Sequence, residues 1–132
     1  MKQLALGLTA FTTIGIITYW TLVFTGTFKV AELVPGYRNW FMSFPLPDGW
    51  IATVSLLAFI FLLKGDDRAS LFGLLTGSSL IFLGLYALMY GINTGLLFIL
   101  TTDELIEIAI KIYCLSVGSF LIVYFWNLIR KG

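Results

Sequence analysis

Residues 69–92 read ASLFGLLTGSSLIFLGLYALMYGI, and none of these side chains carries a charge. A helix needs roughly 20 mostly apolar residues to cross the hydrocarbon layer of a membrane, because that layer is about 30 Å thick and each residue rises about 1.5 Å. The stretch is long enough to do so. Three further charge-free runs are bounded by the pairs Lys2 and Lys29, Asp48 and Lys64, and Lys111 and Arg130.

These four runs predict an all-α integral membrane protein, with four transmembrane helices in an antiparallel bundle. Apolar residues make up 59% of the chain and charged residues only 11%, whereas soluble domains carry about 25% charged residues. We therefore expect the lipid bilayer as its surroundings. The first run is interpreted as a retained span, because it is longer than the apolar part of a secretory signal. The predicted division is one domain over 1–132, spans at about 4–25, 49–64, 69–92 and 104–129, and an outer loop at 26–48.

Composition also restricts the chemistry. The chain has no histidine and a single cysteine, Cys114, which excludes histidine-ligated haem, imidazole-bound zinc and histidine acid–base catalysis. The net charge is +1, so there is no basic patch for nucleic acid. We expect no metal site, no cofactor and no nucleic-acid partner.

The distribution of basic residues predicts the orientation. If the N-terminus is cytoplasmic, the inner side carries five basic residues and the outer side three. Because cytoplasmic loops are richer in Lys and Arg, this count favours cytoplasmic positions for both termini. We expect a prokaryotic plasma membrane as the location. The short polar turn at 64–68 then makes the second and third spans antiparallel neighbours.

The outer loop is rich in proline and aromatic residues. Pro35 and Gly36 interrupt any helix there, and aromatic side chains surround Arg38 in the stretch 37–44. Because aromatic rings favour the headgroup layer, we expect a short interfacial helix or a re-entrant segment, with a lid over a binding site as the alternative. Asp48 is predicted to be the N-cap of the second span, which would then be short for a membrane.

Small residues share one face of the third span. Its glycines recur at spacings of four, seven and seven residues, and the fourth span adds a cysteine and a glycine. The predicted packing residues are Gly73, Gly77, Gly84, Gly91, Cys114 and Gly118. Glycines four residues apart let two membrane helices approach closely. The sequence leaves open whether this face receives the fourth span of its own chain or the third span of another copy.

The start of the fourth span carries most of the predicted outer acidic charge. Residues 96–100 are apolar but too short to span, so we expect them at the outer interface. Thr101 and Glu104 fit a capping box, and Glu107 precedes Lys111 by four residues, the favourable acid-before-base order. Glu107 is thus the predicted partner of Lys111, either in a structural ion pair or in a coupled-ion or substrate site.

Three functions fit these features. The favoured one is a structural or accessory subunit that acts through helix–helix packing, in a homo-oligomer or a larger membrane complex. A small oligomeric transporter or channel is the first alternative. The second is a membrane enzyme acting on a lipid, with carboxylates for acid–base chemistry and Arg38 to hold a phosphate. The candidate binding residues for these alternatives are Glu107, Lys111, Glu104, Arg38 and Asp48.

Overall fold

Four long helices and two short ones make up the described part of the chain. The computed structural model describes residues 1–99 and 101–131. The long helices are α1 (Lys2–Phe24), α3 (Pro45–Lys64), α4 (Arg68–Thr94) and α5 (Thr102–Lys131). The short helix α2 (Tyr37–Phe41) follows the loop after α1, and the 3-10 helix η1 (Leu96–Phe98) lies between α4 and α5. No strand occurs in the described ranges, which confirms the predicted all-α class.

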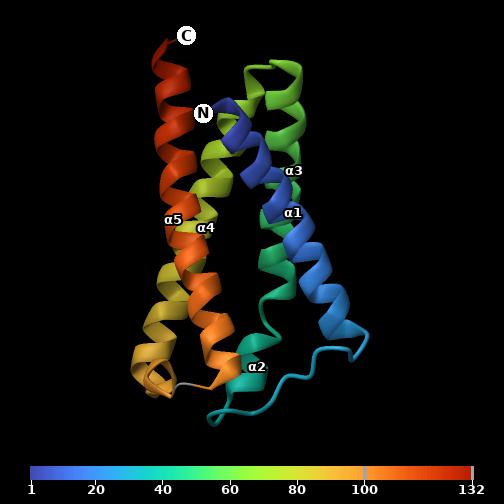
Figure 1. The fold of residues 1–132 in the computed structure, drawn as a ribbon, viewed down its shortest axis with the longest axis vertical. Coiled ribbons are helices and arrows are strands. Elements are labelled where there is room, and N and C mark those ends of the chain that lie inside the picture. Colours follow the sequence, from blue (N-terminus) through green and yellow to red (C-terminus); the bar gives the residue numbers. More distant parts are fainter. Residues whose placement is uncertain (100, 132) are drawn as a thin grey trace.

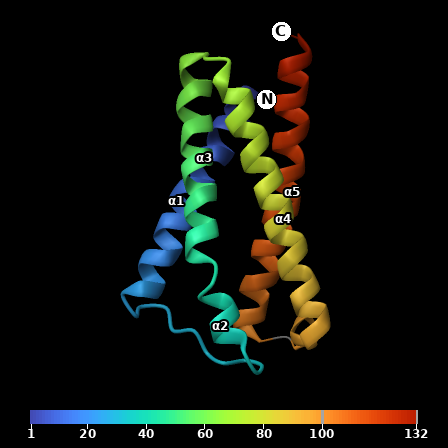
Figure 2. The ribbon, with the colours of Figure 1, turned by 180° about the vertical axis from the view of Figure 1, so that it is seen from behind.

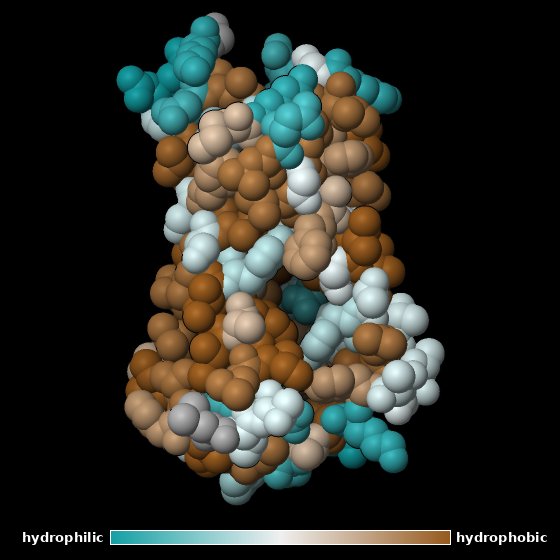
Figure 3. Space-filling view, in the orientation of Figure 1, coloured by the Kyte–Doolittle hydropathy of each residue, from teal (hydrophilic) through white to brown (hydrophobic). Residues whose placement is uncertain are grey.

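Consecutive long helices run antiparallel (Figure 1). Both termini and the α3–α4 turn lie at one end of the bundle, here called the termini end, while α2 and η1 lie at the other, the loop end (Figure 2). All four long helices are long and apolar enough to cross a membrane. Apolar side chains such as Phe11, Phe82 and Ile112 are more than half exposed, and Figure 3 shows a broad hydrophobic band between more polar ends. The chain is a small helical membrane protein.

Helices α4 and α5 pack closely in the termini half, the half of the bundle nearer the termini end. A β-carbon added at Gly77 would lie 2.8 Å from the backbone oxygen of Gly118, and one at Gly118 would lie 2.8 Å from that of Gly77. At Gly73 the added carbon would overlap the ring of Phe125, which is fully buried. The glycine face of α4 therefore lies against α5 of its own chain, the first of the two arrangements that the sequence left open.

Hydroxyl groups join α1 to α3. Ser55 Oγ donates a hydrogen bond to the backbone oxygen of Thr9 at 2.7 Å, and Thr13 Oγ1 donates to that of Ala52 at 3.2 Å. Thr9 Oγ1 also bonds the carbonyl of Ala5 one turn back, at 2.9 Å, as hydroxyls inside membrane helices often do. The side chains of Ser55, Thr9 and Thr13 are buried, so hydrogen bonds contribute to this contact in place of glycine packing.

Helix α3 begins earlier than the sequence indicated. Its first residue is Pro45, and Phe44 occupies the N-cap position without a side-chain cap, so the prediction of Asp48 as the N-cap is wrong. Proline suits the first helical position because its missing N–H would have no helical partner there anyway. The helix has 20 residues and is about 30 Å long, which matches the hydrocarbon thickness. Asp48 lies within its first turn.

The α3–α4 turn is short and polar, as predicted. Gly65 ends α3 in the left-handed backbone region, with φ at 71°, where a residue with a β-carbon would be strained. Asp66 then accepts hydrogen bonds from the backbone N–H of Arg68 at 2.9 Å and from its guanidinium at 2.8 Å. These bonds fix the turn at the surface of the termini end.

The connection from α4 to α5 forms only half of the predicted capping box. The backbone N–H of Glu104 donates to Thr101 Oγ1 at 3.2 Å, but the Glu104 side chain is fully buried and pairs with Lys111 instead of returning to the cap. The apolar segment 96–100 includes η1, in which Leu96 is 2% exposed and therefore part of the interior. The last residue of that segment, Leu100, lies outside the described residues.

The buried side chains of the described residues form two clusters. The first fills the termini half and includes Leu62, Leu121 and Phe125, none more than 4% exposed. The second lies at the loop end and joins Trp20 of α1 to Phe41 of α2. The long helices form two pairs, α1 with α3 and α4 with α5. These pairs diverge toward the loop end, where α2 lies across the gap between them (Figures 1 and 2).

Candidate binding cavity

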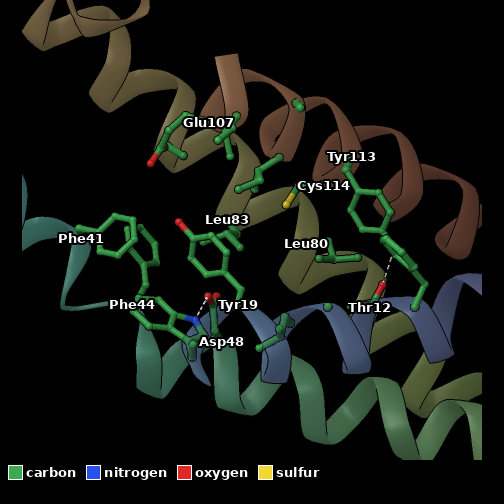
Figure 4. Close-up of a pocket in the computed structure, with 18 of the residues that line it drawn as sticks. Thr12, Tyr19, Phe41, Phe44, Asp48, Leu80, Leu83, Glu107, Tyr113 and Cys114 are labelled. Atoms are coloured by element: carbon green, nitrogen blue, oxygen red, sulfur yellow. Dashed lines mark hydrogen bonds between the residues drawn. The ribbon is translucent and has the colours of Figure 1, made fainter. Parts of the chain in front are cut away.

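A cavity of about 420 Å³ lies between the diverging helix pairs. Helices α1 and α5 form its side walls, α4 forms its floor, and α2 with the start of α3 closes the loop end (Figure 4). Its volume is within the usual range of small-molecule sites, about 300–1,000 Å³. Most of the lining is apolar or aromatic. The lining residues are Phe11, Thr12, Gly15, Ile16, Tyr19, Trp20, Trp40, Phe41, Phe44, Asp48, Leu80, Leu83, Ala87, Ile106, Glu107, Ala109, Ile110, Tyr113 and Cys114.

The cavity opens sideways between α1 and α5. Along its rim, Phe11 of α1 is 61% exposed and Ile110 of α5 is 39% exposed, although both residues also line the cavity. The space-filling view shows a hollow on this face, with a hydrophilic group at its floor (Figure 3). Because the surrounding surface belongs to membrane-spanning helices, the mouth of the cavity faces lipid.

A contact between α1 and α5 limits the cavity on the termini side. The Thr12 and Tyr113 hydroxyl oxygens are hydrogen-bonded at 2.7 Å, and the Tyr113 ring centroid lies 5.6 Å from that of Phe11. Between Thr12 and Phe24, the last residue of α1, the helix rises about 18 Å. The closed end of the cavity therefore lies near the middle of the spanning helices.

Aromatic side chains from the loop between α1 and α3 close the other end. The Trp40 indole stacks on the Tyr90 ring of α4 at a centroid distance of 4.0 Å and meets Phe44 edge-on at 4.8 Å. Phe41 packs against Trp20 of α1 at 5.3 Å. These contacts tie α2 to both helix pairs. The short helix expected in this loop is present, and its residues Trp40 and Phe41 line the cavity.

Asp48 is the first of two carboxylates that line the cavity. The indole N–H of Trp20 donates a hydrogen bond to Asp48 Oδ2 at 2.7 Å (Figure 4). The other oxygen, Oδ1, is buried and has no hydrogen-bond partner among the described residues. A buried polar atom without a partner costs free energy. Asp48 Oδ1 is thus an unused acceptor beside a mostly apolar space.

Glu107 is the second carboxylate and comes from the facing helix α5. The Tyr37 hydroxyl of α2 donates a hydrogen bond to Glu107 Oε1 at 2.6 Å. Glu107 therefore joins α2 to α5, and the prediction that it pairs with Lys111 is wrong. In Figure 4 the Tyr19 hydroxyl is seen between the carboxylates of Asp48 and Glu107, so both carboxylates and this hydroxyl lie toward the loop end of the cavity.

Lys111 pairs instead with Glu104, at 3.4 Å between Nζ and Oε1. In an α-helix, side chains seven residues apart point within about 20° of the same direction, whereas side chains four residues apart differ by about 40°. Glu104 therefore shares the inward face of Lys111. Both side chains are buried, and Gly91 of α4 leaves room for the ammonium group, since a β-carbon there would lie 3.2 Å from Nζ. Neither Lys111 nor Glu104 lines the cavity.

Arg38 lies apart from the cavity carboxylates. It is exposed, and its backbone N–H donates a hydrogen bond to Glu32 Oε1 at 2.7 Å. The cavity lining thus contains Asp48 and Glu107 but not Arg38. The arrangement proposed from the sequence for a lipid phosphate, with Arg38 beside the carboxylates, is not formed by the residues that line the cavity.

Several residues of the cavity carry no functional signal in the sequence. Gly15 and Tyr19 belong to one apolar span and Tyr113 to another, and only the relative positions of the helices bring them to the same space. The available signal was charge, which made Asp48 and Glu107 candidates. Elsewhere in the described residues, no group of three His, Cys, Asp or Glu side chains is placed to hold a metal ion.

Comparison with known proteins provides no relative of this chain. It matches no model of a protein family, and the searches of curated proteins and of solved structures find no match. Its function is therefore argued from the geometry of the cavity: an apolar space that opens to lipid, with two carboxylates toward its loop end.

Proposed function

We propose that this membrane protein binds a lipid-soluble molecule in the cavity between α1 and α5. The observation that carries the proposal is the sideways mouth of an apolar cavity of about 420 Å³ between two membrane-spanning helices. A molecule dissolved in the lipid layer can enter there without crossing water. Because lipid is itself apolar, burial of apolar surface gives little driving force, and the shape and polar groups of the cavity select the ligand.

The geometry supports binding more than conduction. Thr12 and Tyr113 close the cavity on the termini side. Beyond them, the fully buried side chains of Leu121 and Phe125 fill the interior. A solute path through the bundle would require these contacts to separate, so we place the transporter and channel alternative second.

We further propose that the protein acts as an accessory subunit, which holds a membrane molecule for a partner protein. A site that opens to lipid, and not to a path across the bundle, suits this role. A lipid enzyme would need the carboxylates of Asp48 and Glu107 to take part in a reaction. Ligand binding needs them only as hydrogen-bond acceptors, so we rank the enzyme alternative below binding. Gentle extraction from native membranes, followed by mass measurement, should reveal a companion polypeptide in fixed ratio; a homogeneous self-assembly without a companion would contradict the accessory role.

The binding proposal can be tested with the protein's own tryptophans. Trp20 and Trp40 line the cavity, whereas Trp50 and Trp126 are more than half exposed. A parent protein carrying Trp50→Phe and Trp126→Phe is placed in nanodiscs of phosphatidylcholine, and dodecanol brominated on the carbon next to its hydroxyl group is added as a quencher. We expect quenching that saturates, because bromine brought to a single site quenches Trp20 and Trp40 until that site is full.

Two matched glycine substitutions provide the control. A β-carbon at Gly15 or at Gly7 meets no atom within 4 Å, but only Gly15 lines the cavity. Gly15→Phe should therefore fill the cavity and remove the saturable quenching, while Gly7→Phe on the same helix should leave it in place. Quenching that rises linearly in the parent protein, or that still saturates in Gly15→Phe, would contradict the proposed function.

A further inference from the structure

We propose that the polar end of the bound molecule is a hydrogen-bond donor, a protonated amine or a hydroxyl, which lies at Asp48 while the apolar chain points toward Thr12 and Tyr113. This inference rests on the proposed function and defines the class of ligand: amphiphiles whose polar end donates hydrogen bonds, as opposed to fatty acids and other anionic lipids. Three features of the cavity support it: its unused acceptor, the absence of basic residues from its lining, and the position of its closed end.

The carboxylates of the cavity provide the acceptors. Asp48 Oδ1 is buried without a protein partner, and the Oδ2 atom of the same residue already accepts from Trp20. Glu107, on the facing helix, uses one of its two oxygens to accept from Tyr37. A ligand group that donates a hydrogen bond would satisfy Asp48 Oδ1, and bonds donated to a carboxylate are among the strongest that proteins form.

The described lining of the cavity contains no lysine or arginine. Lys111 of α5 is engaged by Glu104 and lies against Gly91, and Arg38 is exposed outside the cavity. An anionic head group would therefore face carboxylates without a cation between them. In a site of low dielectric constant such repulsion is strong, and the same charges attract an ammonium group. The carboxylates thus disfavour anions, although Trp40, which also lines the cavity, has a buried Nε1–H without a hydrogen-bond partner among the described residues.

The placement of these groups along the helices orients the ligand. Asp48 lies in the first turn of α3, and Glu107 lies within two turns of the start of α5, so both are near the loop end. Thr12 and Tyr113, whose hydroxyl groups bond each other, mark the closed end. From Tyr19 to Thr12, α1 rises about 10 Å. A molecule with its polar end at Asp48 keeps that end close to the headgroup layer and extends its chain toward the middle of the membrane.

The test is a competition among probes with the same chain. Dodecylamine, dodecanol and dodecanoate are each added to the quenching assay against brominated dodecanol, in phosphatidylcholine nanodiscs and at a pH where the carboxylate probe is ionised. The amine and the alcohol should displace the brominated probe and restore tryptophan fluorescence. Dodecanoate should not. This comparison uses the unaltered cavity and so does not depend on the folding of a variant.

Two substitutions that each remove one carboxylate charge test whether Asp48 accepts the hydrogen bond from the ligand. Asp48→Asn keeps a side-chain oxygen for the Trp20 N–H but removes the charge, so dodecylamine should bind about tenfold more weakly or worse, and dodecanol should be affected less. Asp103→Asn removes a carboxylate of the first turn of α5 that does not line this cavity. It should leave the affinity for dodecylamine unchanged, which controls for attraction of the amine by surface charge.

The outcomes separate the ligand class from the proposed function. Equal displacement by all three probes, or unchanged amine binding in Asp48→Asn, overturns the donor-selective site, whereas saturable binding of brominated dodecanol keeps the proposed function. If brominated dodecanol shows no saturable binding at all, both the proposed function and the inference are overturned. Displacement by dodecylamine and dodecanol alone, lost for the amine in Asp48→Asn, supports both.

Discussion

The two halves of this bundle are held together in different ways. In the termini half, α4 and α5 meet so closely that a β-carbon at Gly77 or Gly118 would lie 2.8 Å from the backbone of the other helix, and side chains fill the interior. In the loop half the helix pairs separate around a cavity of about 420 Å³. There the contacts are aromatic and polar, such as the hydrogen bond of 2.6 Å from Tyr37 to Glu107.

This difference shows how one set of four helices can provide both a packed core and a site. Glycines let two helices approach, whereas rings such as those of Trp40 and Phe41 occupy the gap and keep the helix pairs apart. Hydrogen bonds between rigid groups then fix the cavity walls. The comparison predicts that polar substitutions affect the loop half most and that size substitutions affect the termini half most.

The largest effect should come from the buried ion pair of the loop half. Lys111→Met leaves the Glu104 carboxylate buried without its cation, and its Oε2 atom already has no partner among the described residues. Removing one member of a buried pair costs about 3–5 kcal/mol. Unfolding in mixed micelles should show this loss, and adding Glu104→Gln to Lys111→Met should recover most of it. A loss below about 1 kcal/mol, as for a solvent-exposed pair, would mean that Lys111 and Glu104 do not form a buried ion pair.

A smaller effect is expected where the termini half is tightest. Gly77→Ala places a β-carbon 2.8 Å from the Gly118 oxygen, so the helices must shift, at a cost of about 1–3 kcal/mol. Gly7→Ala is the control, because its β-carbon meets no atom within 4 Å; it should stabilise α1 slightly through helix propensity, by about 0.5–1 kcal/mol. Equal effects of the two substitutions on unfolding would mean that α4 and α5 do not meet as described.

The boundary between the two halves can be weakened at Thr12. Thr12→Val keeps the side-chain shape but removes the hydrogen bond of 2.7 Å to Tyr113, which should cost about 0.5–1.5 kcal/mol of stability. Thr21→Val serves as the control, since Thr21 bonds the carbonyl of Ile17 in its own helix and is exposed. If thermal unfolding is shifted as much by Thr21→Val as by Thr12→Val, the contact between α1 and α5 does not close the cavity.

The smallest effect concerns the turn at the termini end and depends on pH. Hydrogen bonds from the side chain and backbone of Arg68 lower the pKa of Asp66 from 3.8 to about 2. Because the folded pKa is the lower one, this contribution to stability is present above about pH 4 and is lost as the pH falls toward 2. In Asp66→Asn, the free energy of unfolding measured between about pH 4 and pH 2 should no longer show this contribution. The neighbouring substitution Asp67→Asn should keep it; an unchanged pH profile in Asp66→Asn would contradict the turn geometry.

Much of the fold could be read from the sequence because each feature is local. Runs without charge define the spans, and the glycines of α4 share one face of any α-helix that this stretch forms. Gly65 ends α3 within a polar turn that is evident from five residues. The start of α3 was missed because Pro45 reads as a break, although proline is accepted at the first position of a helix.

The site was only partly predictable, because it depends on how helix pairs diverge. Asp48 and Glu107 stood out by charge, but their partners Trp20 and Tyr37 come from other elements. The spacing of Glu107 and Lys111 favoured a pair on an isolated helix, whereas inside the bundle Lys111 follows the inward face to Glu104. Local spacing indicates which pairs can form, and tertiary packing decides which of them does.

The most direct measurement is the mass of the intact protein released gently from its native membranes. We expect that the unaltered chain carries one bound lipid-soluble molecule, that Gly15→Phe has lost it, and that Gly7→Phe retains it. If the unaltered protein carries no such molecule, or if Gly15→Phe carries the same amount, the loop half is not a binding site and the central claim fails.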